Sequence, residues 1–325
     1  MKLLVVVINY RTPDLTLRAV EATLRELDGI PESAVALVEN DSRDGSYERF
    51  AEEIAARGWG KRVRLSKSRC NGGFSYGVNQ GVRPSLESGD PAEYFYLLNS
   101  DATPLHGSIV TLLRFLEERR EIGIAGSQIF GPDGGLHETA FRFPSLPAEL
   151  ASMARGVPGL TRWLDRHVAA LPIPREDTRV DWLAGASMMI RGEVFADAGL
   201  FDERYFLYYE ETDFCRRALE HGWTTWYVPE SRVEHIGAAS TGWLDFSKPR
   251  TMHWFRGRRY YWLKNHGRAM LWAANAVWMT AFAFGRTKAF LAGRRYDQPP
   301  RLLRDFVKHN LSFSEIGPSL HHERT

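Results

Sequence analysis

Cysteine is scarce in this chain of 325 residues, which contains only Cys70 and Cys215. Neither lies in a CxxC pattern, which argues against a disulfide framework and a cysteine-based zinc site and fits a reducing compartment. The chain also begins without a long apolar segment, because the run Leu3–Ile8 has six residues, whereas a secretory signal needs about 7–15. We interpret this run as a buried first strand and expect a cytoplasmic protein.

Two common nucleotide-binding signatures are missing. No GxGxxG follows the first apolar run, which disfavours an NAD-dependent dehydrogenase. The glycine-rich stretch Asn71–Gly81 has no Lys-Ser or Lys-Thr ending and is therefore not a P-loop. It does lead into a predicted helix, where glycines allow close approach of a ligand and the helix N-terminus favours phosphate. A tight turn with packing glycines is the structural alternative.

Charge is nearly balanced overall, with a net charge of +2, but it is unevenly distributed. Residues 245–325 hold 15 Lys and Arg against 5 Asp and Glu, a net charge of +10, so the rest of the chain carries −8. Such asymmetry indicates an acidic partner for the C-terminal part: a membrane, a diphosphate or a nucleic acid. The alternative is a basic surface that only neutralises its neighbour.

The longest uncharged run lies between Arg268 and Arg286 and has 17 residues, the lower limit of about 17–25 for a membrane span. Six of the 17 are alanine, so we expect a packed or interfacial helix. Arg286, Lys288, Arg294 and Arg295 would then face anionic head groups on a membrane surface. The alternative is that this segment packs on the rest of the chain or in a homodimer.

Strands and helices alternate over the first 130 residues, which predicts a mostly parallel, doubly wound α/β sheet. Apolar patterns predict strands at Leu3–Ile8, Val35–Val38, Val63–Leu65, Tyr94–Leu98 and Ile122–Ile129, and helices at Asp14–Leu27, Ser46–Ala56, Phe74–Val82 and Ile109–Leu116. Residues 131–180 are rich in Pro and Gly, with an apolar helical patch around Leu150–Leu164. A further strand is predicted at Trp182–Ile190.

Polar residues follow the strand predicted at Tyr94–Leu98. Asp101, in Asn99-Ser100-Asp101, therefore lies just past the carboxyl end of a strand, where ligands bind in open α/β sheets. His235 follows another strand-like run far downstream. One carboxylate and one imidazole can share a divalent cation with a diphosphate. Taken singly, such an Asp is usually a turn or cap residue, and such a His a structural one.

Three acidic residues, Glu210, Glu211 and Asp213, lie at the predicted N-terminus of a helix. Acids there complement the helix dipole, and Asp213 can pair with Arg217 one turn later. The aromatic run Phe206–Tyr209 directly before them places at least one carboxylate against apolar walls, which raises its basicity. An acidic pair of this kind can take a proton from an acceptor.

Another polar turn, Glu39–Ser46, ends one strand and opens a helix. Acidic and amide groups at this edge of a sheet can bind a base and a ribose. A simple helix cap at Asp44 or Ser46 is the commoner role of such a turn.

In this order, the motifs resemble glycosyltransferase family 2, inverting enzymes with a GT-A fold, and look closest to its bacterial rhamnosyltransferase-like members. The resemblance covers about residues 3–240. It is carried by Val6-Val7-Ile8-Asn9-Tyr10, Glu39-Asn40-Asp41-Ser42, Asp44-Gly45-Ser46, Asn71-Gly72-Gly73-Phe74, Asn99-Ser100-Asp101, Trp182-Leu183-Ala184-Gly185-Ala186, Phe201-Asp202-Glu203, Glu210-Glu211-Thr212-Asp213 and His235.

The resemblance implies a nucleotide-diphospho-sugar donor, a glycan or lipid-diphosphate-linked acceptor and a divalent metal, Mn²⁺ or Mg²⁺. It implies that Asp101 and His235 hold the metal and that Glu211 is the general base, supported by Glu210 or Asp213. Nucleotide-binding residues would be Asn9, Glu39, Asn40, Asn71, Gly73, Asn99 and Ser100, and acceptor-side residues Gly185 and Ala186. The family commonly has Asp where this chain has Glu211 and Glu39, each one methylene longer.

The resemblance also divides the chain. Residues 1–244 would be the GT-A catalytic domain, with a nucleotide-binding half (1–130), an acceptor-side insertion (131–180) and an acceptor and catalytic half (181–244), followed by a helical, basic, aromatic extension (245–325). The enzyme would be cytoplasmic or peripheral on the inner face of the cytoplasmic membrane, with no nucleic-acid partner. A nucleotidyltransferase and a non-catalytic nucleotide-sugar binding protein are the alternatives from other function classes.

Overall fold

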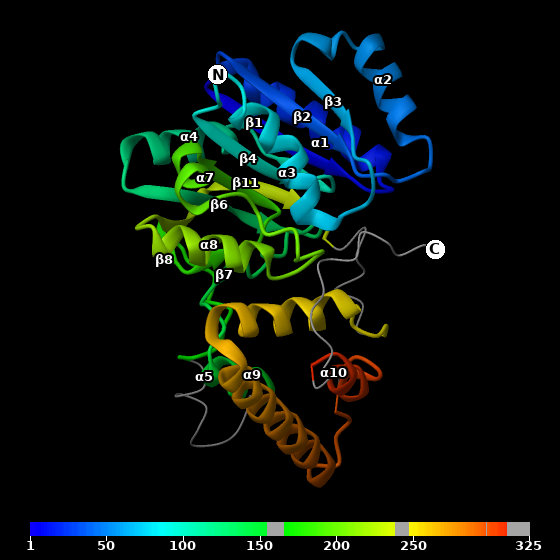
Figure 1. Cartoon of the computed structure of the whole chain (residues 1–325), viewed down its shortest axis with the longest axis vertical. Coiled ribbons are helices and arrows are strands. Elements are labelled where there is room, and N and C mark those ends of the chain that lie inside the picture. The colour runs from blue at the N-terminus through cyan, green and yellow to red at the C-terminus, as the bar shows by residue number, and fades with distance from the viewer. Residues whose placement is uncertain (155–165, 238–246, 297, 311–325) are drawn as a thin grey trace.

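The computed structural model describes residues 1–154, 166–237, 247–296 and 298–310. An α/β body built on one large sheet lies at one end of the molecule, and a group of helices from the C-terminal part lies at the other (Figure 1). The sheet has the strand order β3-β2-β1-β4-β10-β6-β11-β5, with β8 beside β11.

The first half of the sheet is parallel, as predicted. β1 (Leu3–Asn9) lies between β2 (Ser33–Glu39) and β4 (Tyr94–Asn99), and β3 (Val63–Lys67) pairs with the outer side of β2. The connecting helices are α1 (Pro13–Glu26), α2 (Ser46–Ala56), α3 (Gly73–Leu86) and α4 (Ser108–Glu118), with short 3-10 turns at Leu27–Gly29 and Trp59–Lys61. All of these strands and helices are therefore confirmed.

The second half of the sheet is mixed. β6 (Ile122–Phe130) runs parallel to β11 (Thr224–His235), while β10 (Ser187–Arg191) lies antiparallel between β4 and β6. Two short strands, β5 (Ala102–Pro104) and β8 (Thr178–Val180), run antiparallel to β11.

The single strand predicted over Trp182–Ile190 is wrong, because the segment belongs to two sheets. β9 (Trp182–Leu183) pairs with β7 (Ala140–Phe141) in a separate two-stranded sheet, whereas β10 joins the main sheet. Between them, the Gly185 N–H and the Ala186 carbonyl bond to an α8 side chain and to β4. Because these two backbone groups bond outside the small sheet, the chain leaves β9 there and enters β10 of the main sheet.

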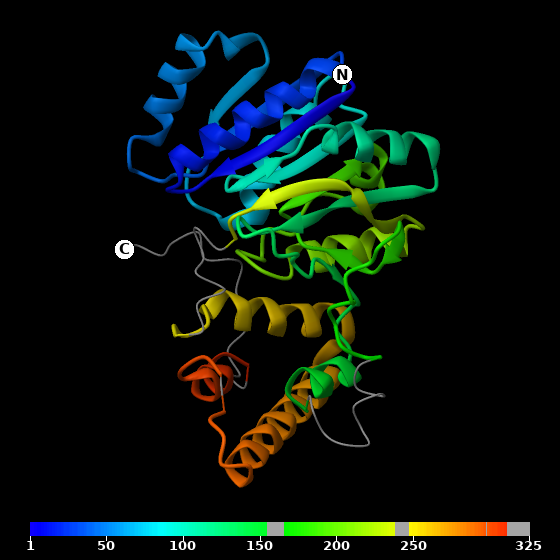
Figure 2. The same ribbon diagram turned by 180° about the vertical axis from the view of Figure 1, so that it is seen from behind.

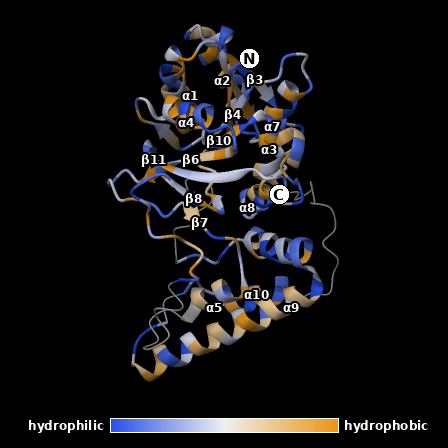
Figure 3. Ribbon diagram, turned by 90° about the vertical axis from the view of Figure 1, so that its left-hand side faces the viewer, coloured by the Kyte–Doolittle hydropathy of each residue, from blue (hydrophilic) through white to orange (hydrophobic). Residues whose placement is uncertain are grey.

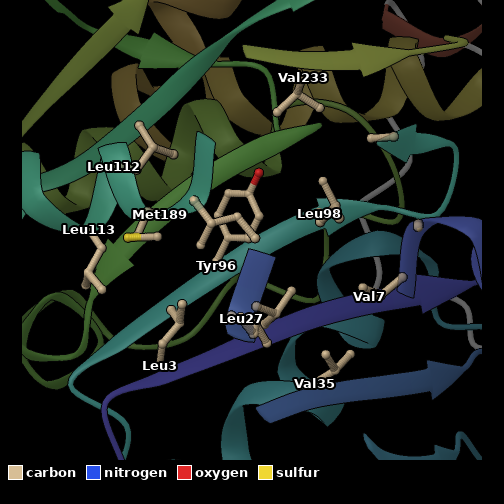
Figure 4. Packing of buried hydrophobic residues seen from close by; sticks show 14 of the residues in the cluster. Leu3, Val7, Leu27, Val35, Tyr96, Leu98, Leu112, Leu113, Met189 and Val233 are labelled. Carbon is tan, nitrogen blue, oxygen red and sulfur yellow. The ribbon is translucent and has the colours of Figure 1, made fainter. Parts of the chain in front are cut away.

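The strand β1 explains why the core has two halves. Successive strand residues point to opposite faces, so Leu3, Val5 and Val7 enter one apolar cluster and Leu4 and Val6 the other. Helices α1, α2 and α4 cover the first face, part of which is seen in Figure 4. Helix α3 covers the second face with α7 (Gly192–Ala198) and α8 (Glu210–Glu220). A strand buried on both faces is continuously apolar rather than alternating.

The C-terminal part is helical, as expected. α9 (Met252–Leu291) is bent at Gly267, whose φ of 79° and ψ of 175° interrupt the helix. Its first half passes close to the α/β body, and its second half runs away from it, beside α5 (Leu146–Ala154) and α10 (Leu302–Asn310) (Figures 1 and 2). α5 is part of the helical patch predicted around residues 150–164, whose remainder lies outside the described residues.

A buried arginine joins these helices. Arg258, fully buried in α9, donates to Glu149 of α5 (2.9 Å), to Asn275 in the second half of α9 (2.8 Å) and to Asn310 of α10 (3.0 Å). Within the described ranges, no helix combines the length and the apolar character needed to cross a bilayer.

Candidate active site

The metal ligands implied for this chain come together at the carboxyl end of β4. Asp101 Oδ1 lies 3.0 Å from His235 Nε2, and the Asn99 amide nitrogen lies 3.3 Å from the same ring nitrogen. The local topology explains this: β5 follows Asp101 directly and pairs antiparallel with the end of β11, in register Ala102 to His235. Residues separated by more than 130 positions in sequence thus meet beside the end of a central strand.

This pair suits a divalent cation. The Asp101 and His235 side chains are 9% and 15% exposed, so they are largely shielded from solvent but still accessible to an ion. Within the described residues, no group of three or more His, Cys, Asp or Glu is placed to hold a metal ion. Two protein ligands are nevertheless the pattern expected for Mg²⁺-type ions, which bind one or two side chains and take their other ligands from phosphate and water.

The turn after β2 is held by residues assigned to the nucleotide. Asn9 is fully buried; its amide donates to Ser42 Oγ (3.1 Å) and accepts from Thr16 Oγ1 (2.8 Å). Glu39, 1% exposed, accepts from the Ser42 N–H at 2.6 Å. Both side chains thus shape the turn from inside, and direct contact between either of them and a nucleotide stays a prediction.

The glycine-rich loop before α3 is tied to the same turn. Asn40 donates to the Asn71 side chain (3.2 Å) and to the Gly73 carbonyl (3.1 Å). Gly73 has a φ of 84°, and a Cβ there would lie within 2 Å of the Phe206 carbonyl, so only glycine fits. Phe74 donates its N–H to that carbonyl at 2.7 Å. The loop therefore contacts the aromatic segment that precedes the acidic residues.

Ser100 contacts the turn that follows the first strand. Its hydroxyl lies 3.1 Å from Thr12 Oγ1, between β1 and α1. Asn99, Ser100 and Asp101 are all half-buried. The contact connects the carboxyl ends of β1 and β4, the edge at which open α/β sheets bind ligands.

Gly185 and Ala186 connect the end of β4, next to Asp101 and His235, with Glu211 at the start of α8. The Gly185 N–H donates to Glu211 Oε1 at 3.0 Å, and the Ala186 carbonyl accepts from the Asn99 N–H at 3.1 Å. A Cβ at Gly185 would lie 2.5 Å from Glu211 Oε1. Two hydrogen bonds to adjacent residues thus fix the start of α8 relative to the end of β4.

Glu210 and Glu211 behave as a coupled pair. Burial, together with the charge of Glu211, raises the pKa of the buried Glu210 well above its usual range. Burial also raises the pKa of the half-buried Glu211, although hydrogen bonds from the Gly185 N–H and from Glu210 oppose that rise. The rise is larger for Glu210, so burial favours the neutral form of Glu210 more strongly than that of Glu211. The raised pKa makes the Glu211 carboxylate a stronger base than that of an ordinary glutamate.

Asp213 faces away from this pair. It is fully buried and accepts from Tyr205 Oη (3.1 Å), Arg217 Nε (3.0 Å) and Lys264 Nζ (2.8 Å). The predicted pairing with Arg217 is confirmed. The structure thus places Asp213 at the junction of α8 and α9.

A family model described as glycosyltransferase-like family 2 matches residues 2–257. The chain belongs to this family. Its relatives include the N-acetylglucosaminyl-diphospho-decaprenol L-rhamnosyltransferase of Mycobacterium tuberculosis, 31% identical over 220 residues that cover 64% of this chain and 68% of the relative. The rhamnosyltransferase WbbL of Escherichia coli is 30% identical over 171 residues, or 50% of this chain and 60% of WbbL.

Solved structures show that this glycosyltransferase has the GT-A fold. A mannosyltransferase from Pyrobaculum calidifontis, in complex with GDP-Man and Mn²⁺, superposes with a TM-score of 0.56 at 12% identity, covering 90% of this chain and 76% of that one. GalNAc-T7, with UDP, GalNAc and Mn²⁺, gives a TM-score of 0.57 at 15% identity, covering 92% of this chain and 59% of that one.

Five of the seven described non-glycine residues with positive φ lie around the site of this glycosyltransferase. Arg11, Asp41, Arg43, Tyr208 and Tyr209 all have φ between 55° and 73°. Such left-handed residues cost about 1–3 kcal/mol each when they are not glycine, and they cluster at functional sites. Because these residue types usually avoid that region, only the structure identifies them.

Proposed function

We propose that this glycosyltransferase moves a sugar, with rhamnose as the first candidate, from a nucleotide-diphosphate donor to a hydroxyl of a glycan or lipid-diphosphate-linked acceptor, with inversion. The observation that carries the proposal is that a possible cation site and a possible general base lie at the same edge of the sheet. Asp101 with His235 can hold a cation and a diphosphate, and Glu211 can take a proton. The names of the rhamnosyltransferase relatives support this choice of sugar and acceptor and a role in polysaccharide synthesis.

The leaving diphosphate would be held at the carboxyl ends of β1 and β4. Asp101 and His235 would bind Mn²⁺ or Mg²⁺, which would neutralise the negative charge that develops on the diphosphate. Metal-bound GT-A neighbours support this assignment. Asn40 and Asn71 would position the nucleotide through the loop that they hold together.

The acceptor hydroxyl would be deprotonated by Glu211, which is the less buried member of the acidic pair. Glu210 would hydrogen-bond the Glu211 carboxylate and help to position it, and the Gly185 N–H donates to Glu211 Oε1 at 3.0 Å. General-base catalysis of this kind contributes about 10²–10⁴-fold. The bond between sugar and diphosphate would break as the acceptor oxygen attacks from the opposite face, so no enzyme nucleophile takes part.

The proposal places the enzyme in the cytoplasm, peripheral to the inner face of the membrane, where a lipid-linked acceptor would be met. One relative has a decaprenol-linked substrate in its name, which supports that location.

A donor panel tests the reaction. Nucleotide-sugars, with dTDP-rhamnose included, are incubated with candidate acceptors and Mn²⁺, and the transferred sugar is measured beside reactions with nucleoside triphosphates. Transfer that stops in chelator is the expected result. Formation of diphosphate from a triphosphate, without sugar transfer, would instead indicate a nucleotidyltransferase.

Calorimetry tests the metal role separately. The nucleoside diphosphate of the active donor should bind more tightly with Mn²⁺ than in chelator, and Asp101→Ala should weaken binding only when Mn²⁺ is present. Equal affinity with and without metal would contradict the assignment of Asp101 and His235.

A further inference from the structure

The end of α9 combines exposed apolar side chains with positive charges that have no acidic partner among the described residues. Phe290 and Leu291, adjacent at the end of α9, are 80% and 79% exposed. Isolated exposed apolar residues are ordinary, but these two are consecutive and lie in a basic segment. We call the surface formed by Arg286, Phe290, Leu291, Arg294 and Arg301 the α9 tip.

The charge at the α9 tip is not neutralised by the described part of the protein. Arg286, Arg294 and Arg301 are exposed, and none forms an ion pair with a described residue. Arg304 differs, because it pairs with Asp305 at 2.8 Å. Guanidinium groups without acidic partners suit an external anion, and Arg binds phosphate through two parallel hydrogen bonds.

A cavity joins the two features. It has a volume of about 450 Å³ and lies where α9, the following loop and α10 meet. Its lining combines the apolar residues Phe282, Phe290 and Leu302 with Arg286, Arg294 and Arg301. An anionic head group among the arginines, with its acyl chains along the phenylalanines, matches this distribution.

The α9 tip lies where it can contact an extended, flat surface such as a bilayer. The tip lies at the end of the molecule opposite β2 and β3 (Figures 1 and 2), and the second half of α9 carries polar and apolar residues side by side along its length (Figure 3). It can therefore meet an extended surface without obstruction by the α/β body. No described helix could span the bilayer, so contact through this surface would be interfacial.

We propose that the α9 tip docks this protein on a bilayer of anionic phospholipid. Phe290 and Leu291 enter the head-group region, and the arginines bind lipid phosphates. Amphipathic helices bind membranes through buried apolar area plus attraction to anionic lipid. The inference rests on the peripheral location proposed above and names the surface that would make the contact. Its test is separate from that of sugar transfer, because docking is measured without a sugar donor.

Co-sedimentation of the full chain with lipid vesicles tests the proposal. Vesicles of phosphatidylcholine mixed with phosphatidylglycerol should bind the protein at low salt, and vesicles of phosphatidylcholine alone should not. Replacing Arg286, Arg294 and Arg301 together with Gln should weaken binding on the order of 100-fold. Phe290→Ser with Leu291→Ser should weaken it on the order of tenfold or more.

A matched variant controls for overall charge. Arg18→Gln, Arg64→Gln and Arg114→Gln together remove three exposed charges from the α/β body and should leave binding unchanged. An equal loss in this variant would overturn the proposal, as would failure of the wild-type chain to sediment with anionic vesicles at low salt. If the Phe290 and Leu291 variants instead dissociate a dimer in velocity sedimentation without lipid, the tip is an interface between copies and the membrane proposal is wrong.

Discussion

At the scale of single residues, Gly185 decides where the Glu211 carboxylate lies. Its N–H holds Oε1 at 3.0 Å, and a Cβ would approach the same oxygen to 2.5 Å. We predict that Gly185→Ala displaces the carboxylate and lowers kcat on the order of 10²-fold, because misplacement of a catalytic group by about 1 Å can cost that much. Donor affinity, measured by calorimetry, should change little.

Gly89→Ala is the matched control for this substitution, because a Cβ at Gly89 meets nothing within 4 Å. It should leave kcat and the free energy of unfolding near their wild-type values. Wild-type kcat in Gly185→Ala would show that the position of Glu211 does not limit turnover.

The acid limb of the pH profile reports the state of Glu211. Burial raises the pKa of Glu211, so its proton stays bound to a higher pH than on an ordinary Glu, and kcat/KM falls as pH drops through that raised value. Glu210→Ala removes a hydrogen bond that lowers the Glu211 pKa, so the acid limb should move to higher pH. Glu210→Gln keeps a donor at that place and should move the limb less. A limb unmoved in both variants would exclude Glu211 as the titrating group.

Some residues were predictable because their signal is local. Asp101 and His235 follow apolar runs, and strand ends gather at one edge of an open sheet. The orientation of Asp213 was not predictable in this way. Two helical positions correspond to a rotation of about 200°, which turns Asp213 away from Glu211 and toward Lys264, 51 residues later in the chain.

At the scale of elements, the first half of α9 supports α8. Lys264 Nζ lies 2.8 Å from both Asp213 and Asp202, and Tyr260 donates to Asp202 at 3.0 Å. Tyr261 also packs near Tyr209, the residue before α8, with 5.7 Å between ring centroids. These contacts tie the C-terminal part of the chain to the helix that presents Glu211.

We predict that Lys264→Met lowers the free energy of unfolding by about 2–3 kcal/mol, because it leaves a buried carboxylate without one of its charged partners. Urea unfolding measures the loss. Lys308→Met on α10, where the lysine is exposed, is the matched control and should cost less than about 0.5 kcal/mol. Equal stability of the two variants would mean that α9 does not support α8 through Lys264.

Element boundaries were predictable where the apolar periodicity and the segment length both indicate the same element, and were less predictable elsewhere. The parallel strands and their helices match the periodicity of the first 130 residues. The segment Trp182–Ile190 has the composition of one strand, yet it divides at Gly185 because tertiary hydrogen bonds to Glu211 and Asn99 replace strand pairing. Such bonds join distant parts of the chain and leave no local pattern.

At the scale of the whole molecule, the GT-A fold brings two separate sequence regions to one edge. Antiparallel β10 between β4 and β6 allows the Gly185-Ala186 turn to lie between the Asp101 and His235 pair and the start of α8. The alternating pattern predicted the α/β class, and the ordered motifs predicted the family. The bend of α9 at Gly267, its packing on α5 and its hydrogen bond from Lys264 to Asp213 of α8 required the structure.

The proposed enzyme uses Glu211 as the base and Asp101 with His235 for the metal and the donor diphosphate. The turnover number of Glu211→Gln tests this claim most directly. Glutamine keeps the size of the side chain and removes its basicity. We predict that kcat falls by about 10²-fold or more, while the affinity for the donor with Mn²⁺ stays at the wild-type value because Asp101 and His235 are intact. Near-normal turnover in Glu211→Gln would contradict the assignment of Glu211 as the base.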